Sequence, residues 1–218
     1  MKGSIMKVLL ALSGKRGWIL PIVGVLLISG VLGCARLQKP YPEKNLFLVE
    51  CRCESMVQSD SDAPILEIQR FEVAEPFSGK EMVYRIGPLQ YDSDFYNIYF
   101  VPPAGMIEGE VRRCLAGCGA FSQVVEHGSR LKADYLLEAE VTALYGDLSD
   151  PLAPKAVVEI AFLLLKPVSG GSEIVLARTW RSETVLEGRG GEALAEGLSV
   201  SLGEVMKGLT AEIGKTVK

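Results

Sequence analysis

Hydrophobic and polar residues alternate along most of the chain after residue 45. Apolar side chains at every second position favour a β-strand with one buried face. Eight segments show this alternation or a short continuous apolar run: 46–54, 64–75, 81–87, 95–101, 121–127, 134–147, 155–168 and 173–187. Segment 121–127 is short, so we expect about six to seven strands in one mixed sheet.

Two segments have helical spacing instead. Residues 104–117 follow Pro102 and Pro103, repeat apolar residues at intervals of three and four, and end near Gly117. The C-terminal segment places its apolar residues on one helical face: Leu194, Leu198, Leu202, Val205, Leu209 and Ile213. We therefore predict an α/β fold, or a two-layer α+β arrangement, with two main helices in a single domain over residues 46–218.

The first 33 residues differ from this domain. Their only charges are four basic residues in the first half, and residues 17–33 carry no charge. A basic start, an apolar stretch and small residues at its end are typical of a secretory signal peptide. A transmembrane helix would need about 20 apolar residues, and this run is shorter and contains Pro21. We predict a signal peptide over residues 1–33.

Cys34 directly follows the apolar run. The sequence Val31-Leu32-Gly33-Cys34 resembles the lipobox of bacterial lipoproteins, which implies that Cys34 carries a covalent lipid and becomes the mature N-terminus. An uncleaved membrane anchor and a buried thiol are the alternatives. Acyl chains would hold the protein at a membrane, because each buried methylene contributes about 0.8 kcal/mol. Residues 34–45 contain two prolines and mixed charges, and we predict that they form a lipidated tether.

Charge and motifs exclude several functions. Loss of residues 1–33 removes four of 23 basic residues and none of 27 acidic ones, so the formal net charge falls from −4 to −8. We expect no nucleic-acid partner, because nucleic acids bind basic surfaces. The chain lacks a Walker A motif, a nucleophile elbow and an HExxH zinc motif. His127 is the sole histidine, and an envelope hydrolase that uses it is a less favoured alternative to a protein without enzyme activity.

Four cysteines remain after Cys34. Cys51, Cys53, Cys114 and Cys118 lie on the apolar faces of a predicted strand and a predicted helix. These positions suit core thiols, or a disulfide from strand to helix, which an exported compartment favours. The CxC and CxxxC spacings differ from the paired CxxC of zinc sites, so we expect no metal.

Aromatic residues concentrate between positions 84 and 100. Six of the 14 Phe and Tyr residues lie there: Tyr84, Tyr91, Phe95, Tyr96, Tyr99 and Phe100. Alternation would place them on both faces of a strand, which fits either a central strand buried on both sides or a surface that docks a partner. The candidate docking residues are Tyr84, Arg85, Tyr96, Tyr99 and Phe100.

Taken in order, these segments resemble the ABC-type transport auxiliary lipoprotein family of the paraquat-inducible protein C type. The resemblance spans about residues 46–215 and rests on the order and spacing of LFLVE, LEIQRFEVAEPFSGKEMVYRIG, YNIYFVPPAGMIEGEVRRCLAGCGAFSQV, ADYLLEAEVTALYGD and VLARTW. The family commonly has a tryptophan shortly before the prolines, where this chain has Tyr99-Phe100-Val101.

The resemblance implies a non-enzymatic role with no cofactor other than the covalent lipid on Cys34. The partners would be an MCE-domain protein, an ABC permease and its ATPase, in a system that moves lipids across the envelope. The domain would face the periplasm at the outer membrane, since Ala35 rather than aspartate follows the cysteine. A homo-oligomer is compatible with this role. A structural envelope lipoprotein that binds the cell wall or another assembly is the alternative.

Overall fold

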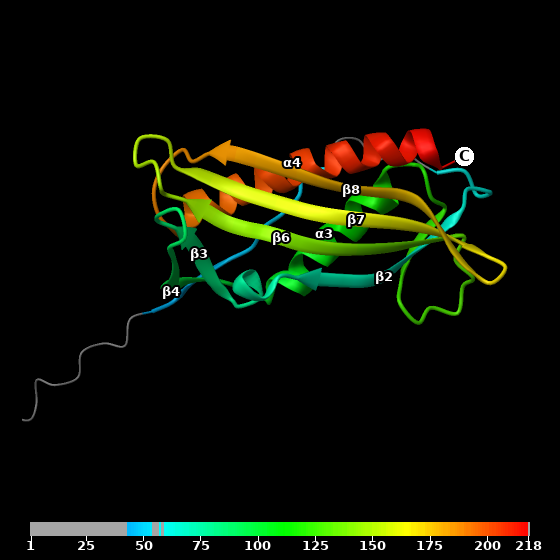
Figure 1. Cartoon of the computed structure of the whole chain (residues 1–218), viewed down its shortest axis with the longest axis horizontal. Coiled ribbons are helices and arrows are strands. Elements are labelled where there is room, and N and C mark those ends of the chain that lie inside the picture. The colour runs from blue at the N-terminus through cyan, green and yellow to red at the C-terminus, as the bar shows by residue number, and fades with distance from the viewer. Residues whose placement is uncertain (1–42, 54–56, 58, 218) are drawn as a thin grey trace, which may run out of the picture. The chain divides into compact units, whose positions relative to one another are not determined.

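In the computed structural model, eight strands form one mixed sheet, and two long helices cover one of its faces (Figure 1). The structure describes residues 43–53, 57 and 59–217. The strands are β1 (Asn45–Phe47), β2 (Ile65–Val73), β3 (Glu81–Arg85), β4 (Tyr91–Tyr99), β5 (Gln123–Glu126), β6 (Tyr135–Asp147), β7 (Lys155–Val168) and β8 (Gly171–Val185). The helices are α3 (Pro103–Gly117), α4 (Gly191–Thr216) and the short 3-10 helix η2 (Glu75–Phe77). The predicted α/β class is confirmed.

The central strand is β6, and the sheet branches there. One edge of β6 pairs antiparallel with β7, which pairs antiparallel with β8. Two strands share its other edge. The first half of β6 pairs parallel with β2, which also pairs with β5, and its last residues pair parallel with β3. From β3 the sheet continues through β4 to β1, so β1 and β8 are two of its edges.

The core lies between the sheet and the helices. Alternate residues of β7 are at most 2% exposed and face the helices: Ala156, Val158, Ile160, Phe162 and Leu164. The apolar stripe of α4 packs against β7 and β8, as its spacing predicts, while α3 packs against β2 and β5. Each large aliphatic side chain fully buried in this way contributes about 1.5–3 kcal/mol to stability.

Glycine residues let α4 approach the sheet closely. A Cβ atom on Gly197 would lie 2.7 Å from Leu186 Cδ2 and 2.8 Å from Ala156 Cβ. A Cβ atom on Gly208 would lie 2.6 Å from the indole ring of Trp180. These distances are shorter than an ordinary van der Waals contact. A side chain at either position would therefore push α4 away from the sheet.

The predicted strand over residues 46–54 is largely wrong, although its burial pattern is right. Only its first residues pair with another strand, in β1. Val49 and Cys51 are buried while Leu48 and Glu50 are exposed, as alternation predicts. The backbone N–H groups of residues 49, 50 and 51 bind helix side chains instead of a strand: Met106 Sδ, Ser199 Oγ and Glu110 Oε2. Residues 48–53 therefore form an extended strap across α3 and α4.

The predicted signal peptide, Cys34 and the tether up to residue 42 lie outside the described residues. Among the residues that are described, no helix is long and apolar enough to cross a membrane.

Substitution of Gly197 tests the packing of α4. We expect Gly197→Ala to lower the free energy of unfolding by about 1–3 kcal/mol, because the added methyl group overpacks the contact with β7. The control is Gly109→Ala in α3, where an added Cβ atom would meet nothing within 4 Å. This substitution should raise the free energy of unfolding by about 0.5–1 kcal/mol. Urea unfolding measures both. Equal stabilisation by the two substitutions would contradict the proposed close contact.

Candidate functional site

A bulge in β4 turns two aromatic side chains to solvent. Met82 of β3 lies opposite Asp94, but the preceding Glu81 lies opposite Ile98, so residues 95–97 have no partner in β3. Extra residues of this kind interrupt the alternation of a strand. Phe95 and Tyr96 are consequently 51% and 49% exposed, with their rings edge to face at 5.3 Å. We call these two residues the aromatic bulge.

Asp94 fixes the conformation of the bulge. Its carboxylate accepts hydrogen bonds from the backbone N–H groups of Tyr96 at 2.9 Å and Asn97 at 3.0 Å, and from Asn97 Nδ2 at 2.7 Å. Burial alone would raise the pKa of Asp94, but these bonds lower it, so the carboxylate is ionised at neutral pH. Asn97 Oδ1 accepts a bond from Asn45 Nδ2 at 3.0 Å, which ties the bulge to β1.

Other exposed apolar residues occur beside the bulge, because β1 pairs with the end of β4. They lie on β1, directly after it, or directly after β4: Leu46, Leu48, Phe100 and Val101. On the bulge itself, the Lys44 ammonium lies 4.5 Å from the centre of the Phe95 ring, within the range of a cation–π contact. A concentration of exposed apolar side chains is typical of a surface that contacts another molecule.

The structure separates the five candidate docking residues. Tyr96 and Phe100 are about half exposed, whereas Tyr99 is 1% exposed and belongs to the core. The inclusion of Tyr99 in a docking surface is therefore wrong, because its ring is covered by the packed core. Tyr84 is half-buried, and burial and then Asp94 raise its pKa to about 12. The guanidinium of Arg85 is bound to Asp147.

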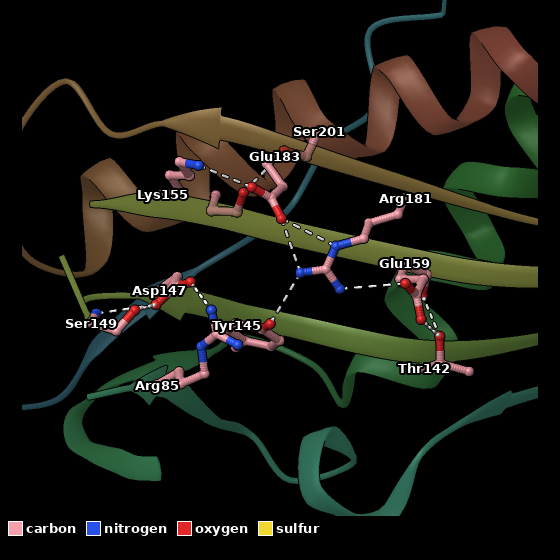
Figure 2. Close-up of polar contacts among 11 residues, drawn as sticks. Arg85, Thr142, Tyr145, Asp147, Ser149, Lys155, Glu159, Arg181, Glu183 and Ser201 are labelled. Atoms are coloured by element: carbon pink, nitrogen blue, oxygen red, sulfur yellow. Dashed lines mark hydrogen bonds and ion pairs between the residues drawn. The ribbon is translucent and has the colours of Figure 1, made fainter. Parts of the chain in front are cut away.

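The sheet face opposite the helices carries a network of paired charges. Arg181 of β8 lies at its centre (Figure 2). Its guanidinium donates to Glu183 at 3.0 Å, to Glu159 at 3.3 Å and to the Tyr145 hydroxyl at 3.3 Å. Lys155 donates to Glu183 at 3.1 Å, and Thr142 donates to Glu159 at 2.7 Å. A separate pair joins Arg85 to Asp147, which also accepts from Ser149.

These pairs leave the carboxylates poorly suited to acid catalysis. Burial alone would raise the pKa of Asp147, but hydrogen bonds from Arg85 and Ser149 lower it to about 2. Hydrogen bonds from Lys155 and Arg181 lower the pKa of Glu183. Both groups are thus ionised and paired at neutral pH, and they stabilise the sheet rather than donate protons.

His127 directly follows β5. Its side chain is 71% exposed, and Nδ1 lies 2.9 Å from Glu67 Oε1. It is absent from the lining of two grooves in the described part of the chain, one beside α4 and one over β7 and β8. Among the described residues, no hydrogen bond joins its imidazole to a serine, threonine or cysteine.

The cysteines form both of the arrangements that their positions allowed. Cys53 and Cys114 form a disulfide between the strap and α3, while Cys51 is a buried free thiol and Cys118 a half-buried one. The sulfur atoms of Cys51, Cys53 and Cys114 lie within 4.8 Å of one another. A soft metal ion prefers such sulfur ligands, but it requires thiolates, and two of these sulfurs are joined in the disulfide.

A groove of about 920 Å³ runs between the strap and α4. Polar and apolar side chains line it, including Leu48, Glu50, Ala195, Val200 and Met206. The cysteines at positions 53, 114 and 118 lie along the same groove. Its composition suits a ligand with both polar and apolar parts.

Comparison with known proteins identifies the family. Residues 52–209 match the family described as ABC-type transport auxiliary lipoprotein component. The chain belongs to this family. This confirms the resemblance of the ordered segments. Among curated proteins, no sequence matches the chain.

Two solved structures share the fold of this auxiliary lipoprotein. Protein XCC0632 from Xanthomonas campestris, a DUF330 protein, has a TM-score of 0.67 and 18% identity, over 79% of this chain and 94% of that one. The hypothetical protein CT253 from Chlamydia trachomatis has a TM-score of 0.50 and 9% identity, over 71% and 98% respectively. At these identities the likeness establishes the fold alone.

Sequence reasoning about this auxiliary lipoprotein missed the bulge and therefore Phe95. The signal was present, because Asp94 and Asn97 are residues that bind their own backbone and interrupt strands. Asp92 and Ser93 precede them and add to the polar, turn-forming character of this part of β4.

Removal of the Asp147 charge tests the pair with Arg85. The folded pKa, about 2, lies below the ordinary value, so the pair stabilises the protein above about pH 4 and this gain is lost as the pH falls toward 2. We expect Asp147→Asn to lower the free energy of unfolding by about 2 kcal/mol at pH 7, and the difference to narrow below pH 4. Urea unfolding across pH measures this. Asp150→Asn, on the exposed loop after β6, is the control and should have little effect; a loss that is independent of pH would contradict the assignment.

Proposed function

We propose that the protein is a lipid-anchored adaptor that faces the periplasm and serves an ABC system in the bacterial envelope. The system contains a permease, an ATPase and an MCE-domain protein, and it transports lipids. Family membership over residues 52–209 is the observation that carries the proposal, because the family is an auxiliary component of ABC-type transport. In this role the protein binds and positions other components and catalyses no reaction.

Two attachments define the proposed mechanism. The lipid on Cys34 holds the protein at the membrane, which we propose is the outer membrane. Eight residues lie between Cys34 and Glu43, and the nine steps from one to the other span about 30 Å in a fully extended chain. In this mechanism, the point where the chain enters the folded body stays within that distance of the bilayer.

The aromatic bulge is the second proposed attachment. Phe95 and Tyr96 expose large side chains that lose little conformational entropy on binding. Asp94 holds their backbone in one conformation before a partner arrives, which reduces the ordering cost of association. We assign the MCE-domain protein as the partner of this surface, with an apolar site that receives the two rings.

The two rival functions have weaker support. A hydrolase would need His127 in a cleft beside a nucleophile, and the imidazole instead lies exposed beside Glu67. A structural lipoprotein of the cell wall would also carry the lipid and would differ only in its partner. The partner experiment below separates that role from transport.

Replacement of Cys34 tests the lipid attachment. We expect Cys34→Ser to abolish acylation. The variant should then be found in the soluble fraction, or as the precursor that keeps its signal peptide. Mass spectrometry of the N-terminal peptide measures the modification. Retention of the same lipid mass in the variant would contradict the assignment.

Replacement of the aromatic bulge tests the partner surface. We expect the Phe95→Ala, Tyr96→Ala double variant to reduce co-purification of the MCE-domain protein about 30-fold or more, as expected for loss of aromatic hot spots. Ile174→Ala is the matched control, because Ile174 is 63% exposed on β8, another edge of the sheet. Circular dichroism establishes that both variants are folded. Equal recovery of the partner with both variants would exclude the bulge as the docking surface.

A further inference from the structure

Three sulfur atoms meet where the strap crosses α3. The disulfide between Cys53 and Cys114 joins the strap to the helix. Cys51 Sγ lies 3.1 Å from Cys114 Sγ and 4.0 Å from Cys53 Sγ. Cys51 is 1% exposed and is a free thiol. A third sulfur beside a disulfide is the arrangement from which thiol–disulfide exchange starts.

We propose that Cys51 exchanges with Cys53 as the disulfide partner of Cys114, and that the released Cys53 thiol is a covalent modification site for low-molecular-weight disulfides in the groove beside α4. The Cys51 thiol gives its proton to a solvent base, and the resulting thiolate attacks Cys114 Sγ. The Cys51–Cys114 bond forms and the Cys53–Cys114 bond breaks. Cys53 leaves as a thiolate and takes up a proton. The exchange involves no net oxidation or reduction.

The strap must shift slightly for this step. Exchange proceeds with the three sulfurs nearly in line, and a disulfide of about 2.05 Å in line with the 3.1 Å contact would place the outer sulfurs about 5 Å apart. The observed separation of the Cys51 and Cys53 sulfurs is 4.0 Å. The strap can move because none of its residues is in a strand; bonds to helix side chains hold it, including that from the Cys51 N–H to Glu110.

The resting state keeps the exchange slow. Burial and, to a smaller extent, the charge of Glu110 raise the pKa of Cys51 to about 11, although the charge of Arg113 lowers it in part. Only about one Cys51 in ten thousand is then a thiolate at pH 7, and the thiolate is the species that attacks. The structure therefore shows the closed arrangement, in which the thiol next to the disulfide is inaccessible.

The exchange changes which thiol a ligand can reach. Cys51 lies in the core, whereas Cys53 is half-buried and lines the groove of about 920 Å³. A small disulfide, such as glutathione disulfide, reacts there with the Cys53 thiolate. One of its sulfurs bonds to Cys53 as its own S–S bond breaks, and its other half leaves as a thiolate that takes up a proton from water. The product is a mixed disulfide on the strap, next to α4.

Alkylation of the folded, full-length protein without reductant tests the exchange. N-ethylmaleimide traps free thiols, and tryptic mapping locates them. Trypsin cuts after Arg52 and Arg113, so Cys51 and Cys53 fall on separate peptides, 45–52 and 53–70, while Cys114 and Cys118 share peptide 114–130. We expect alkylation of Cys53 to increase with time, together with linkage of peptide 45–52 to peptide 114–130. Absence of both changes would overturn the proposal.

Cys51→Ala is the decisive variant. It removes the attacking thiol, so alkylation of Cys53 should slow at least tenfold and addition of glutathione to peptide 53–70 should be lost. Alkylation of Cys118 reports general opening of the fold and should change less than twofold. Equal alkylation of Cys53 in the wild type and the variant would refute the role of Cys51.

A second variant tests the new bond directly. In Cys53→Ser, we expect Cys51 and Cys114 to form a disulfide on oxidation, which leaves Cys118 as the free thiol of the folded domain. Persistence of free thiols at Cys51 and Cys114 would also overturn the proposal.

Discussion

The packing of α4 onto β7 and β8 is the interaction on which the rest of the folded domain depends. Its leucines are fully buried against β7, and glycines at positions 197 and 208 bring its backbone within contact distance of the sheet. The buried Ser201 hydroxyl is bonded to Thr184 at 2.7 Å, so this packing leaves no unpaired hydroxyl at that position. The opposite side of α4 provides Ser199, which accepts the Glu50 N–H and so helps to hold the strap. The groove therefore depends on α4, which also helps to hold the strap that carries Cys51 and Cys53.

Burial of side chains is easier to predict from this sequence than the hydrogen-bond partners of the backbone. Alternation correctly places Val49 and Cys51 in the core, yet it implies a strand partner for residues that bind helix side chains instead. The amide of Cys51 binds a glutamate 59 positions away in the sequence. No local pattern specifies such a partner. The long strands β6 and β7 were predictable because their apolar residues repeat over many positions and their neighbours are strands.

The candidate site shows the same limit. Clustering of aromatic residues identifies the region, but the bulge decides which rings reach solvent. The bulge in turn depends on the hydrogen bonds that Asp94 accepts from the backbone. Tyr99 and Tyr96 are three residues apart, and the first is in the core while the second is exposed. The pairing of Arg85 with Asp147, 62 positions apart, likewise follows from the parallel register of β3 and β6. Once that register is known, Arg85 and Asp147 are seen to stabilise the sheet rather than to form a binding site.

The position of β1 links the two proposed attachments physically. β1 is the first described strand, and it pairs in parallel with residues 97–99, at the end of the bulge. Asn45 is also bonded to Asn97. Tension on the proposed tether would therefore act first on the strand that borders the aromatic bulge. A partner that binds Phe95 and Tyr96 would be held beside the point where the chain enters the fold, and its binding site would have to lie within reach of the lipid anchor. With the proposed anchor and partner in place, the same short strand would limit both the distance from the membrane and the orientation at which the folded body holds its partner.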